Sequence, residues 1–395
     1  MNNPDFDVII VGGGPGGSTA GYLLSNYGLN VLIIDKEKFP RPKLCGGMLS
    51  LKAIYLLREI FNETPSSLNK KGIFNYQSDH YEITYKLERV LTKNHSELPF
   101  IFTHRSVYDN FLLKKAKEAG ATVLEGKNVK SINLSTCEVF LSEGEKYSAK
   151  YIIGADGANS VVRQELIRKG FIKKEQWQKN MATALECYID RNNIDDDYYD
   201  HPVLLFGLVK GGYLWIFPNK ERLVVGLGAL NRKNKGSFMK VLQNLITDLN
   251  FNDPLPKIAG HPVPFGNYKI NPLYKDKIIL IGDAGGFVDP LMGEGIYYTQ
   301  KTAEFASSAI YQHINKKKSL KSSYLKNLRQ YIYPELRNVL LIRWLCFQKM
   351  NTTLKYYPVQ YIVKSIEKQF VELIQGVRSY KSFRKELNIN EILGV

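Results

Sequence analysis

Residues 7–37 read DVIIVGGGPGGSTAGYLLSNYGLNVLIIDKE, and this stretch decides the fold. An apolar run at 8–11 suits a strand buried on both faces, and a glycine turn, a helical segment and a second strand follow. Within the turn, Gly12, Gly14 and Gly17 fit the spacing G-x-G-x-x-G. The first glycine permits a tight turn, the second lets the backbone approach a pyrophosphate, and the third lets the helix pack on the strand. The stretch therefore predicts a βαβ unit that binds a dinucleotide.

The acid at the end of the second strand narrows the choice of dinucleotide. Asp35 lies 23 residues after Gly12, where an acid suits a pair of ribose hydroxyls and would repel a 2′-phosphate. The free N–H groups and the positive dipole end of the helix N-terminus favour the pyrophosphate. Pro15, Gly16 and Lys36 flank these positions, and we assign them to the same site.

The size and composition of the chain are those of a globular protein. With 395 residues it exceeds one usual hydrophobic core, so two domains or large insertions are expected. Four cysteines lie apart without metal-binding spacing, which predicts a reducing compartment and no structural metal. The N-terminus leaves no room for a signal peptide, and no apolar run reaches the length of a membrane span. We expect a cytoplasmic protein, either free or peripheral on the inner face of the membrane.

The net charge of +16 is concentrated towards the C-terminus, where residues 311–395 carry 16 Lys and Arg against 5 Glu. Such a segment suits anionic lipid, nucleic acid or simple solvation. No aromatic-basic RNA-binding motif or helix-turn-helix signature accompanies it, so nucleic acid is not expected as a partner. Residues 316–360 combine lysines with apolar stretches and are the segment expected to touch a membrane. A helical cap with a solvated basic face is the alternative.

Two later motifs supply further loops at strand ends. Residues 151–166, YIIGADGANSVVRQEL, run from an apolar strand into a turn at Asp156 and then into a helix. Residues 277–298, KIILIGDAGGFVDPLMGEGIYY, end another strand at Asp283 and open a long helix at about Gly295. A loop that only closes a sheet does not explain so many glycines, whereas a bound cofactor does.

The order and spacing of these motifs resemble those of FAD-dependent enzymes with the para-hydroxybenzoate-hydroxylase-like fold, over about residues 1–310. By this resemblance Asp283 binds the ribityl chain of FAD, and the backbone at 293–295 lies under the pyrimidine edge of the flavin. Arg105, in THRSVYDNFLLKKA, matches an arginine near the cofactor. The other implied cofactor contacts are Arg41, Cys45, Gly46, Asp156, Gly157, Gly282, Gly293, Gly295 and Ile296.

The physical properties of reduced flavin agree with this placement. Reduced flavin carries negative charge on its pyrimidine side, and a helix that starts near Gly295 would direct free N–H groups at that charge. No second G-x-G-x-x-G follows a strand elsewhere in the chain. We therefore expect NAD(P)H or a reduced carrier protein to visit transiently as the electron donor.

Three shorter matches resemble the geranylgeranyl reductase family, whose members saturate isolated double bonds of polyprenyl chains on lipids, chlorophyll precursors or quinones. The matches are Cys45-Gly46-Gly47 in FPRPKLCGG, the pattern Y-x-W-x-F-P at 213–218, and the segment that runs through Pro290 to Gly295. Some members carry a proline where this chain has Lys210.

The aromatic pattern has a physical use in such an enzyme. Tyr213, Trp215 and Phe217 alternate along a strand, so they share one face and could line a long apolar slot. On pattern alone, aromatics at this period are more often core, and the resemblance favours the slot. It also places Gly47 and Pro290 among the substrate contacts.

Reduction of an alkene needs a hydride and a proton. Cys45 and Tyr213 are the catalytic candidates for relaying that proton. The alternative for Cys45 is that it only shapes the pocket or gates its redox state.

Two other function classes compete with a reductase. YLWIFP partly resembles the W-x-W-x-I-P pattern of flavin-dependent halogenases, with tyrosine and phenylalanine at two hallmark positions. A flavin-dependent monooxygenase or halogenase that acts on an apolar or aromatic substrate is therefore the first alternative. A basic surface-binding protein that keeps FAD for structure is the second.

The resulting organisation is an α/β protein with an inserted second domain. A discontinuous, Rossmann-type FAD-binding domain, an antiparallel-sheet substrate domain and a basic C-terminal helical region are expected. The FAD-binding domain is expected at 1–70, 100–175 and 270–315. The substrate domain is expected at 71–99 and 176–269, and the C-terminal region at 316–395. The expected substrate is a prenylated lipid, a quinone or a pigment precursor.

Overall fold

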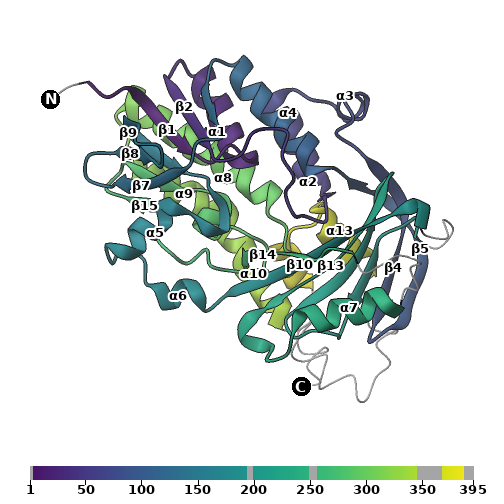
Figure 1. Cartoon of the computed structure of the whole chain (residues 1–395). Coiled ribbons are helices and arrows are strands. Elements are labelled where there is room, and N and C mark those ends of the chain that lie inside the picture. Colours follow the sequence, from purple (N-terminus) through teal and green to yellow (C-terminus); the bar gives the residue numbers. More distant parts are fainter. Residues whose placement is uncertain (1–2, 194–198, 249–255, 345–366, 387–395) are drawn as a thin grey trace.

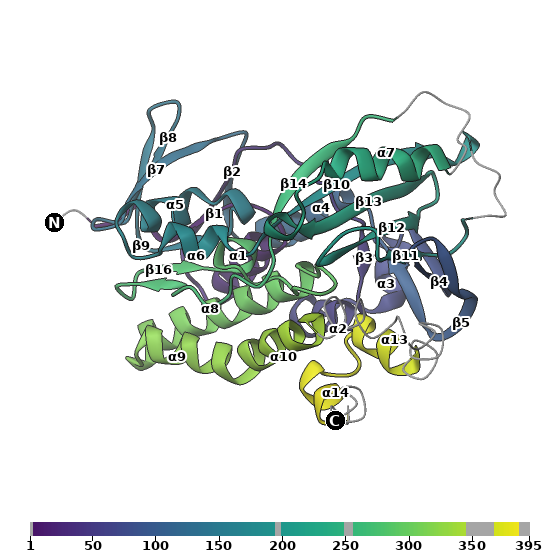
Figure 2. The same ribbon diagram turned by 90° about the horizontal axis from the view of Figure 1, so that it is seen from below.

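The computed structural model describes residues 3–193, 199–248, 256–344 and 367–386. Two eight-stranded sheets organise the described chain, one towards the N-terminal strands and one around the long β4–β5 hairpin (Figure 1). Helices lie on both faces of each sheet (Figure 2). The combination of a parallel dinucleotide-binding sheet with a second sheet confirms the predicted fold class.

The first sheet contains the dinucleotide-binding unit. Strand β1 pairs in parallel with β2 and β9. Val8 and Ile10 face a core that contains the helices α1, α4 and α8, whereas Ile9 and Val11 face a core that contains α5. The apolar run is therefore buried on both sides, as parallel sheets require. The strands along the sheet are β15 (Leu273–Tyr274), β16 (Ile278–Leu280), β9 (Lys146–Gly154), β1 (Phe6–Val11), β2 (Val31–Asp35) and β6 (Thr122–Glu125).

The remaining elements around this sheet follow the motifs read from the sequence. A hairpin of β7 (Val129–Asn133) and β8 (Glu138–Leu141) extends β9. The helices are α1 (Pro15–Asn26), α2 (Leu51–Phe61), α3 (Pro65–Lys70), α4 (Arg105–Glu118), α5 (Val161–Arg168), α6 (Lys174–Gln178) and α8 (Ile296–Lys316). The long helix expected from about Gly295 is thus α8, and Gly295 is the residue that precedes it.

The second sheet is mainly antiparallel, and helices cover its two faces (Figure 2). One face packs on α7 (Phe238–Asp248), and the other faces α10 (Tyr333–Trp344), α13 (Glu367–Gln375) and α14 (Tyr380–Glu386). The strands in order are β14 (Ala259–Pro264), β10 (Met181–Asp190), β13 (Arg222–Leu230), β12 (Gly212–Pro218), β11 (Val203–Phe206), β4 (Tyr76–Tyr85), β5 (Glu88–Phe102) and β3 (Met48–Leu49).

One strand pair departs from the antiparallel expectation. β4 and β11 pair in parallel, with Val203 opposite Glu82. These strands belong to two separate insertions, because the chain returns to the first sheet between them, and a direct hairpin cannot join them. Strand β3 lies within the range 1–70, which we assigned to the FAD-binding domain, yet it pairs with β5 of the second sheet. The segment that contains Cys45 therefore crosses from one sheet to the other.

The C-terminal region is helical in its described parts. Val339 and Ile342 of α10 are buried against the second sheet, and α9 (Leu320–Asn327) packs on α8. Residues 345–360 of the segment expected at a membrane lie outside the described ranges. Among the helices that the structure describes, none combines the length and the apolar character needed to cross a bilayer.

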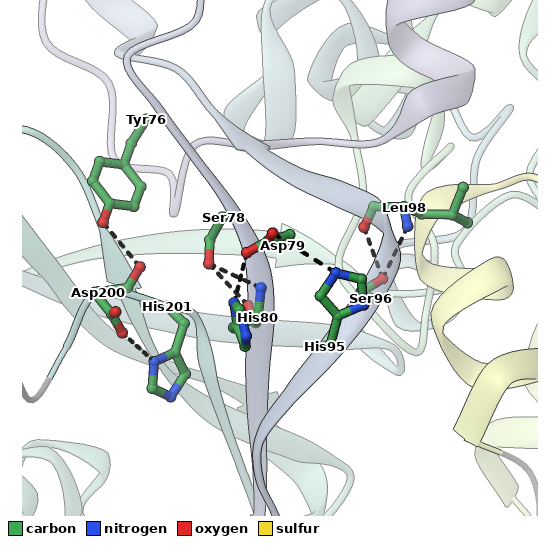
Figure 3. A network of polar contacts seen from close by, with 9 residues as sticks. All are labelled: Tyr76, Ser78, Asp79, His80, His95, Ser96, Leu98, Asp200 and His201. Atoms are coloured by element: carbon green, nitrogen blue, oxygen red, sulfur yellow. Dashed lines mark hydrogen bonds and ion pairs between the residues drawn. The ribbon is translucent and has the colours of Figure 1, made fainter.

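Side-chain hydroxyl groups stabilise the irregular pairing of β4 and β5 (Figure 3). The register of the two strands shifts between Ser78 and His80. Ser78 Oγ donates to the carbonyl of His80 over 3.1 Å and accepts from its N–H over 3.2 Å. Ser96 contacts Leu98 in the same way, over 2.8 and 3.2 Å. The hydroxyls thus satisfy backbone groups that the shifted ladder leaves open.

The same region gathers several histidines and acids (Figure 3). Asp79 contacts His80 Nδ1 at 2.6 Å and His95 Nε2 at 3.8 Å, and Asp200 contacts His201 Nδ1 at 2.5 Å. The Asp79 side chain is 62% exposed, so its pairs add little to stability. Within the described ranges, no group of three or more His, Cys, Asp or Glu side chains is arranged to hold a metal ion.

Candidate active site

A cavity of about 660 Å³ lies where the two sheets meet. Its lining includes the glycine turn, the end of β2, the Cys45 loop, the turn at Asp156 and the loop at 282–296, together with the aromatic residues of β12. Its size lies within the range of about 300–1,000 Å³ that is typical of ligand and cofactor sites. Of the residues assigned to the site from the sequence, all line the cavity except Gly17 and Pro290.

The glycine turn leaves space for a phosphate group. Gly12 has φ +103°, and a Cβ atom there would lie 2.5 Å from the carbonyl oxygen of Ala155. A Cβ atom at Gly17 would overlap the carbonyl oxygen of Gly12, so Gly17 serves helix packing, which explains its place behind the cavity wall. A Cβ atom at Gly14 would meet only Arg41, at 3.6 Å. This opening at the start of α1 fits the pyrophosphate of a dinucleotide.

The loops that carry Asp156 and Asp283 complete this half of the cavity. Asp156 Oδ2 accepts from the N–H of Val161 over 2.6 Å, whereas its buried Oδ1 has no hydrogen-bond partner in the described part of the chain. Arg163 donates to the carbonyls of Ala158, at 2.5 Å, and Ala284, at 3.2 Å, which ties this loop to the one that carries Asp283. Burial raises the pKa of both Asp156 and Asp283. An unpaired buried carboxylate oxygen suits a hydroxyl-bearing ligand.

The loop before α8 is fixed by two acids. Asp289 Oδ1 accepts from the N–H groups of Leu291 and Met292 over 2.7 and 2.9 Å. Glu294 pairs with Lys52 at 2.5 Å and accepts from Ser50. Gly295, the N-cap residue of α8, has no side chain with which to cap the first turn. The backbone N–H groups of this turn can therefore interact with negative charge on a ligand.

Pro290 lies behind this loop rather than on the cavity wall. Its carbonyl oxygen accepts from Nη1 of Arg343 over 3.2 Å, and Arg343 belongs to α10. The residue that we assigned to substrate contact therefore anchors the C-terminal helices to the loop, because its carbonyl faces α10.

An arginine pair shares one buried acid beside the Cys45 loop. Arg105 donates from Nε and Nη2 to Asp109, over 2.7 and 2.9 Å, and Arg41 Nη1 lies 3.3 Å from the same carboxylate. Burial lowers the pKa of Arg105, but the ion pair with Asp109 and hydrogen bonding with the Cys45 thiol raise it above its usual value. The guanidinium group is therefore a fixed positive charge next to Cys45.

The Cys45 loop packs directly on the aromatic strand. A Cβ atom at Gly46 would lie 2.7 Å from Cδ2 of Phe217. Gly47 has φ +78°, and a Cβ atom there would overlap the carbonyl oxygen of Thr103. The N–H of Gly47 donates to Cys45 Sγ over 3.4 Å. Both glycines are thus needed for the loop to approach the second sheet.

The aromatic residues of β12 face the cavity and not the α7 side. Tyr213, Trp215 and Phe217 belong to the core that includes the C-terminal helices, whereas Leu214 and Ile216 pack towards α7. Adjacent rings lie 5.7 and 6.1 Å apart. They form a continuous aromatic wall that a flat or apolar ligand could contact.

The hydroxyl group of Tyr213 is already engaged. It donates to the carbonyl oxygen of Met292 over 2.7 Å and joins the wall to the loop before α8. Burial, followed by the charges of Asp289 and Cys45, raises the pKa of Tyr213 above its usual value. The phenol is therefore neutral at physiological pH, and its proton is held by the backbone.

Sequence reasoning missed two polar groups of the cavity. Glu186 of β10 lies at its wall, 3% exposed. His261 of β14 lies there too, and its Nε2 accepts from Lys43 Nζ over 2.6 Å. Burial and the charge of Lys43 lower the pKa of His261 to about 4, and burial lowers that of Lys43 to about 8. The sequence did contain a signal for Asp109, the acid that Arg41 and Arg105 share. Asp109 follows Arg105 by four residues, a spacing that places two side chains next to each other on a helix.

Comparisons with known proteins identify the family of this chain. A family profile described as "FAD binding domain" matches residues 5–198. An uncharacterised protein of Methanosarcina barkeri is 34% identical over 82% of this chain and 80% of its own length. The digeranylgeranylglycerophospholipid reductase of Methanocaldococcus jannaschii is 28% identical over 78% of each chain. The chain belongs to the geranylgeranyl reductase family of FAD-dependent oxidoreductases.

Solved structures show the same fold. A geranylgeranyl bacteriochlorophyll reductase-like protein from Thermoplasma acidophilum aligns with a TM-score of 0.74 at 21% identity, over 94% of this chain and 98% of that one. A halogenase, PltM, in complex with FAD aligns with a TM-score of 0.70 at 17% identity, over 95% and 87% of the two chains. The fold is therefore shared by reductase-like proteins and halogenases.

Two alanine variants separate the packing and the binding roles of the glycine turn. Gly17→Ala should lower the stability of the FAD-free protein by about 1–3 kcal/mol, because its methyl group overlaps the Gly12 carbonyl. Gly14→Ala should keep that stability and lose FAD affinity, because its methyl group enters the open space. Denaturant unfolding and FAD titration measure the two effects. Equal stability of the two variants would contradict this division.

Proposed function

We propose that this chain is an FAD-dependent reductase that saturates isolated double bonds of a prenyl chain of the geranylgeranyl type. The chain would be carried by a lipid, a quinone or a pigment precursor. The observation that carries the proposal is that one cavity joins the FAD motifs to a deep aromatic wall. The name of the reductase from Methanocaldococcus jannaschii supports the same reaction class.

The residues present fit FAD. The opening at Gly14, the Oδ1 of Asp156, which has no partner in the described ranges, and the first turn of α8 are places for a pyrophosphate, hydroxyl groups and a ring edge. Asp35 accepts from the N–H of Gly13 over 2.7 Å and thus holds the turn against β2. Bound FAD, once reduced, supplies the hydride.

The protein's own contribution is to place an isoprenoid unit and to exclude water. The wall of Tyr213, Trp215 and Phe217 offers apolar surface to a prenyl chain. Ile374 of α13 also lines the cavity, so the C-terminal helices help to close it. Cys45 borders the space between the FAD motifs and the wall, where an alkene would have to lie.

The electron donor and the location are parts of the same proposal. NAD(P)H or a reduced carrier protein would reduce the cofactor in a transient encounter. A prenylated substrate resides in a membrane, so we propose peripheral contact on its cytoplasmic face through residues 316–360. Lys317, Lys318 and Lys321 in this segment are exposed, which suits anionic headgroups.

The product mass tests the reaction. The FAD-bound protein is reduced with dithionite without oxygen and mixed with a geranylgeranyl phospholipid or a prenylquinone. Each saturated bond should add two hydrogens to the substrate. Mass spectrometry measures the gain. An unchanged mass, with flavin reoxidation only after air is admitted, would favour the monooxygenase or halogenase class instead.

The Cys45 position can be tested against a matched cysteine. Cys45→Ala should slow the reoxidation of reduced enzyme by prenyl substrate at least about tenfold, or about 1.4 kcal/mol, because Cys45 borders the site. Cys187→Ala is the control, since Cys187 is buried and lies in the core beneath α7. Stopped-flow absorbance measures both rates. Unchanged reoxidation in the Cys45 variant would exclude a role for the thiol in the reaction.

Charge reversal tests the membrane contact. Lys317→Glu combined with Lys318→Glu should reduce retention on anionic liposomes at least about tenfold, because each lysine near a surface contributes about 1 kcal/mol. The control is Lys130→Glu with Lys169→Glu, two exposed lysines around the first sheet. Co-sedimentation at low and high salt measures retention. Equal losses for the two pairs would argue against a specific contact through 316–360.

A further inference from the structure

Glu186 is a buried acid that the roles described so far do not use. On β10 (Met181–Asp190), Leu185, Cys187 and Ile189 pack in the core beneath α7. Glu186 alternates with them and lines the cavity, 3% exposed. Its Oε2 has no hydrogen-bond partner in the described ranges. A buried, incompletely paired carboxyl group is costly, which makes it a candidate for function.

The sheet register places Glu186 in line with the aromatic wall. Glu186 is opposite Gly226 of β13, and Gly226 is opposite Trp215 of β12. A Cβ atom at Gly226 would lie 2.6 Å from Cζ2 of Trp215, so only glycine leaves room for the indole. Two strand spacings, or about 9–10 Å, separate the backbones of Glu186 and Trp215.

A second set of paired residues across the same three strands repeats this arrangement. Ala184 is opposite Gly228, and Gly228 is opposite Tyr213. The Trp215 indole therefore lies over Gly226 and close to Gly228, and the Glu186 carboxyl group is on the strand beyond these glycines. An isoprenoid unit that packs against this indole, in the cavity that Glu186 also lines, would have the carboxyl group near it.

Charged groups from several elements surround Glu186. Lys43 of the Cys45 loop, Arg105 of α4 and Arg222 of β13 face it, together with the backbone N–H of Cys45. Of the other titratable groups, Tyr188 and Cys187 share its strand, Tyr213 lies on β12 and His261 of β14 contacts Lys43. Burial raises the pKa of Glu186 to about 7, although these positive charges lower it. The carboxyl group can therefore gain and lose a proton near neutral pH.

The two other candidates for the proton are less suited. The hydroxyl of Tyr213 donates its proton to the carbonyl of Met292. Cys45 Sγ accepts from the N–H of Gly47 over 3.4 Å and interacts with the Arg105 guanidinium, so it is already engaged by two groups of the protein. Glu186 accepts from the backbone N–H of Cys45, but its buried Oε2 has no hydrogen-bond partner in the described ranges.

We propose that Glu186 is the acid that protonates the prenyl double bond. This assignment rests on the proposed reductase function. The bound, reduced cofactor would supply a hydride, with its electron pair, to one alkene carbon. The other carbon uses the π electrons to form a C–H bond as the O–H bond of Glu186 breaks. The carboxylate that remains regains a proton from solvent, so each turnover adds one hydride and one proton.

The test uses holoenzyme in the wild-type, Glu186→Gln and Glu165→Gln forms. Glu165 is a matched buried glutamate that pairs with Arg168 on α5, away from the cavity. Each protein is reduced without oxygen and mixed with a geranylgeranyl phospholipid, and flavin reoxidation is followed from acidic to alkaline pH. The wild-type rate should fall as the pH rises through about 7, because the protonated acid is the active form.

The expected results distinguish the acid from a structural residue. Glu186→Gln should react about 10²–10⁴-fold more slowly and lose the fall in rate near pH 7. Glu165→Gln should match the wild type. Glu186→Asp, which retains an acid, should keep the fall in rate. In the FAD-free protein, a carboxylic-acid infrared band that titrates near pH 7 should be present in the wild type and absent from Glu186→Gln.

Each contrary outcome has a separate meaning. If the wild type turns over while Glu186→Gln shows the same rate and pH profile, the acid assignment is wrong and the reductase function stands. If no prenyl substrate reoxidises the reduced wild type, the proposed function fails and the assignment with it. A titrating infrared band that persists in Glu186→Gln would also overturn the assignment, whether or not that variant binds FAD.

Discussion

The close contact between the Cys45–Gly47 loop and the second sheet is the constraint on which the rest of the site depends. This loop carries the chain from β2 to β3 and so joins the two sheets. Gly46 approaches Phe217, and Gly47 approaches the Thr103 carbonyl, more closely than any side chain would permit. With larger residues the loop would stand away from the aromatic wall. The FAD motifs and the wall would then line two separate spaces.

Electrostatic balance is the second property of the cavity. Arg41 and Arg105 share the buried carboxylate of Asp109, and Lys43 contacts a neutral His261. These contacts fix the positions of the three positively charged side chains, which can then interact with an anionic cofactor. Burial raises the pKa of Glu186, and no described residue forms a direct ion pair with it, so its proton remains available. This difference gives Asp109 a structural role, whereas it makes Glu186 the candidate for a chemical role.

The sequence was sufficient for features that depend on local chain geometry. The glycine spacing at 12–17, the acid at Asp35 and the alternation along β12 follow from short-range rules, and their residues meet at one cavity. Glu186 could not be found in this way. An acid between apolar residues of a strand usually faces solvent, but helices cover both faces of this sheet. Its charged neighbours are Lys43, Arg105 and Arg222, which lie far apart in the sequence and which only the fold brings together.

A crystal structure of the FAD-bound protein with a geranylgeranyl phospholipid would test the central claim most directly. The account predicts an isoprenoid unit in this cavity, against the Trp215 indole and between the flavin and the carboxyl group of Glu186. A prenyl chain bound outside the cavity, or a Glu186 side chain turned away from the double bond, would contradict it.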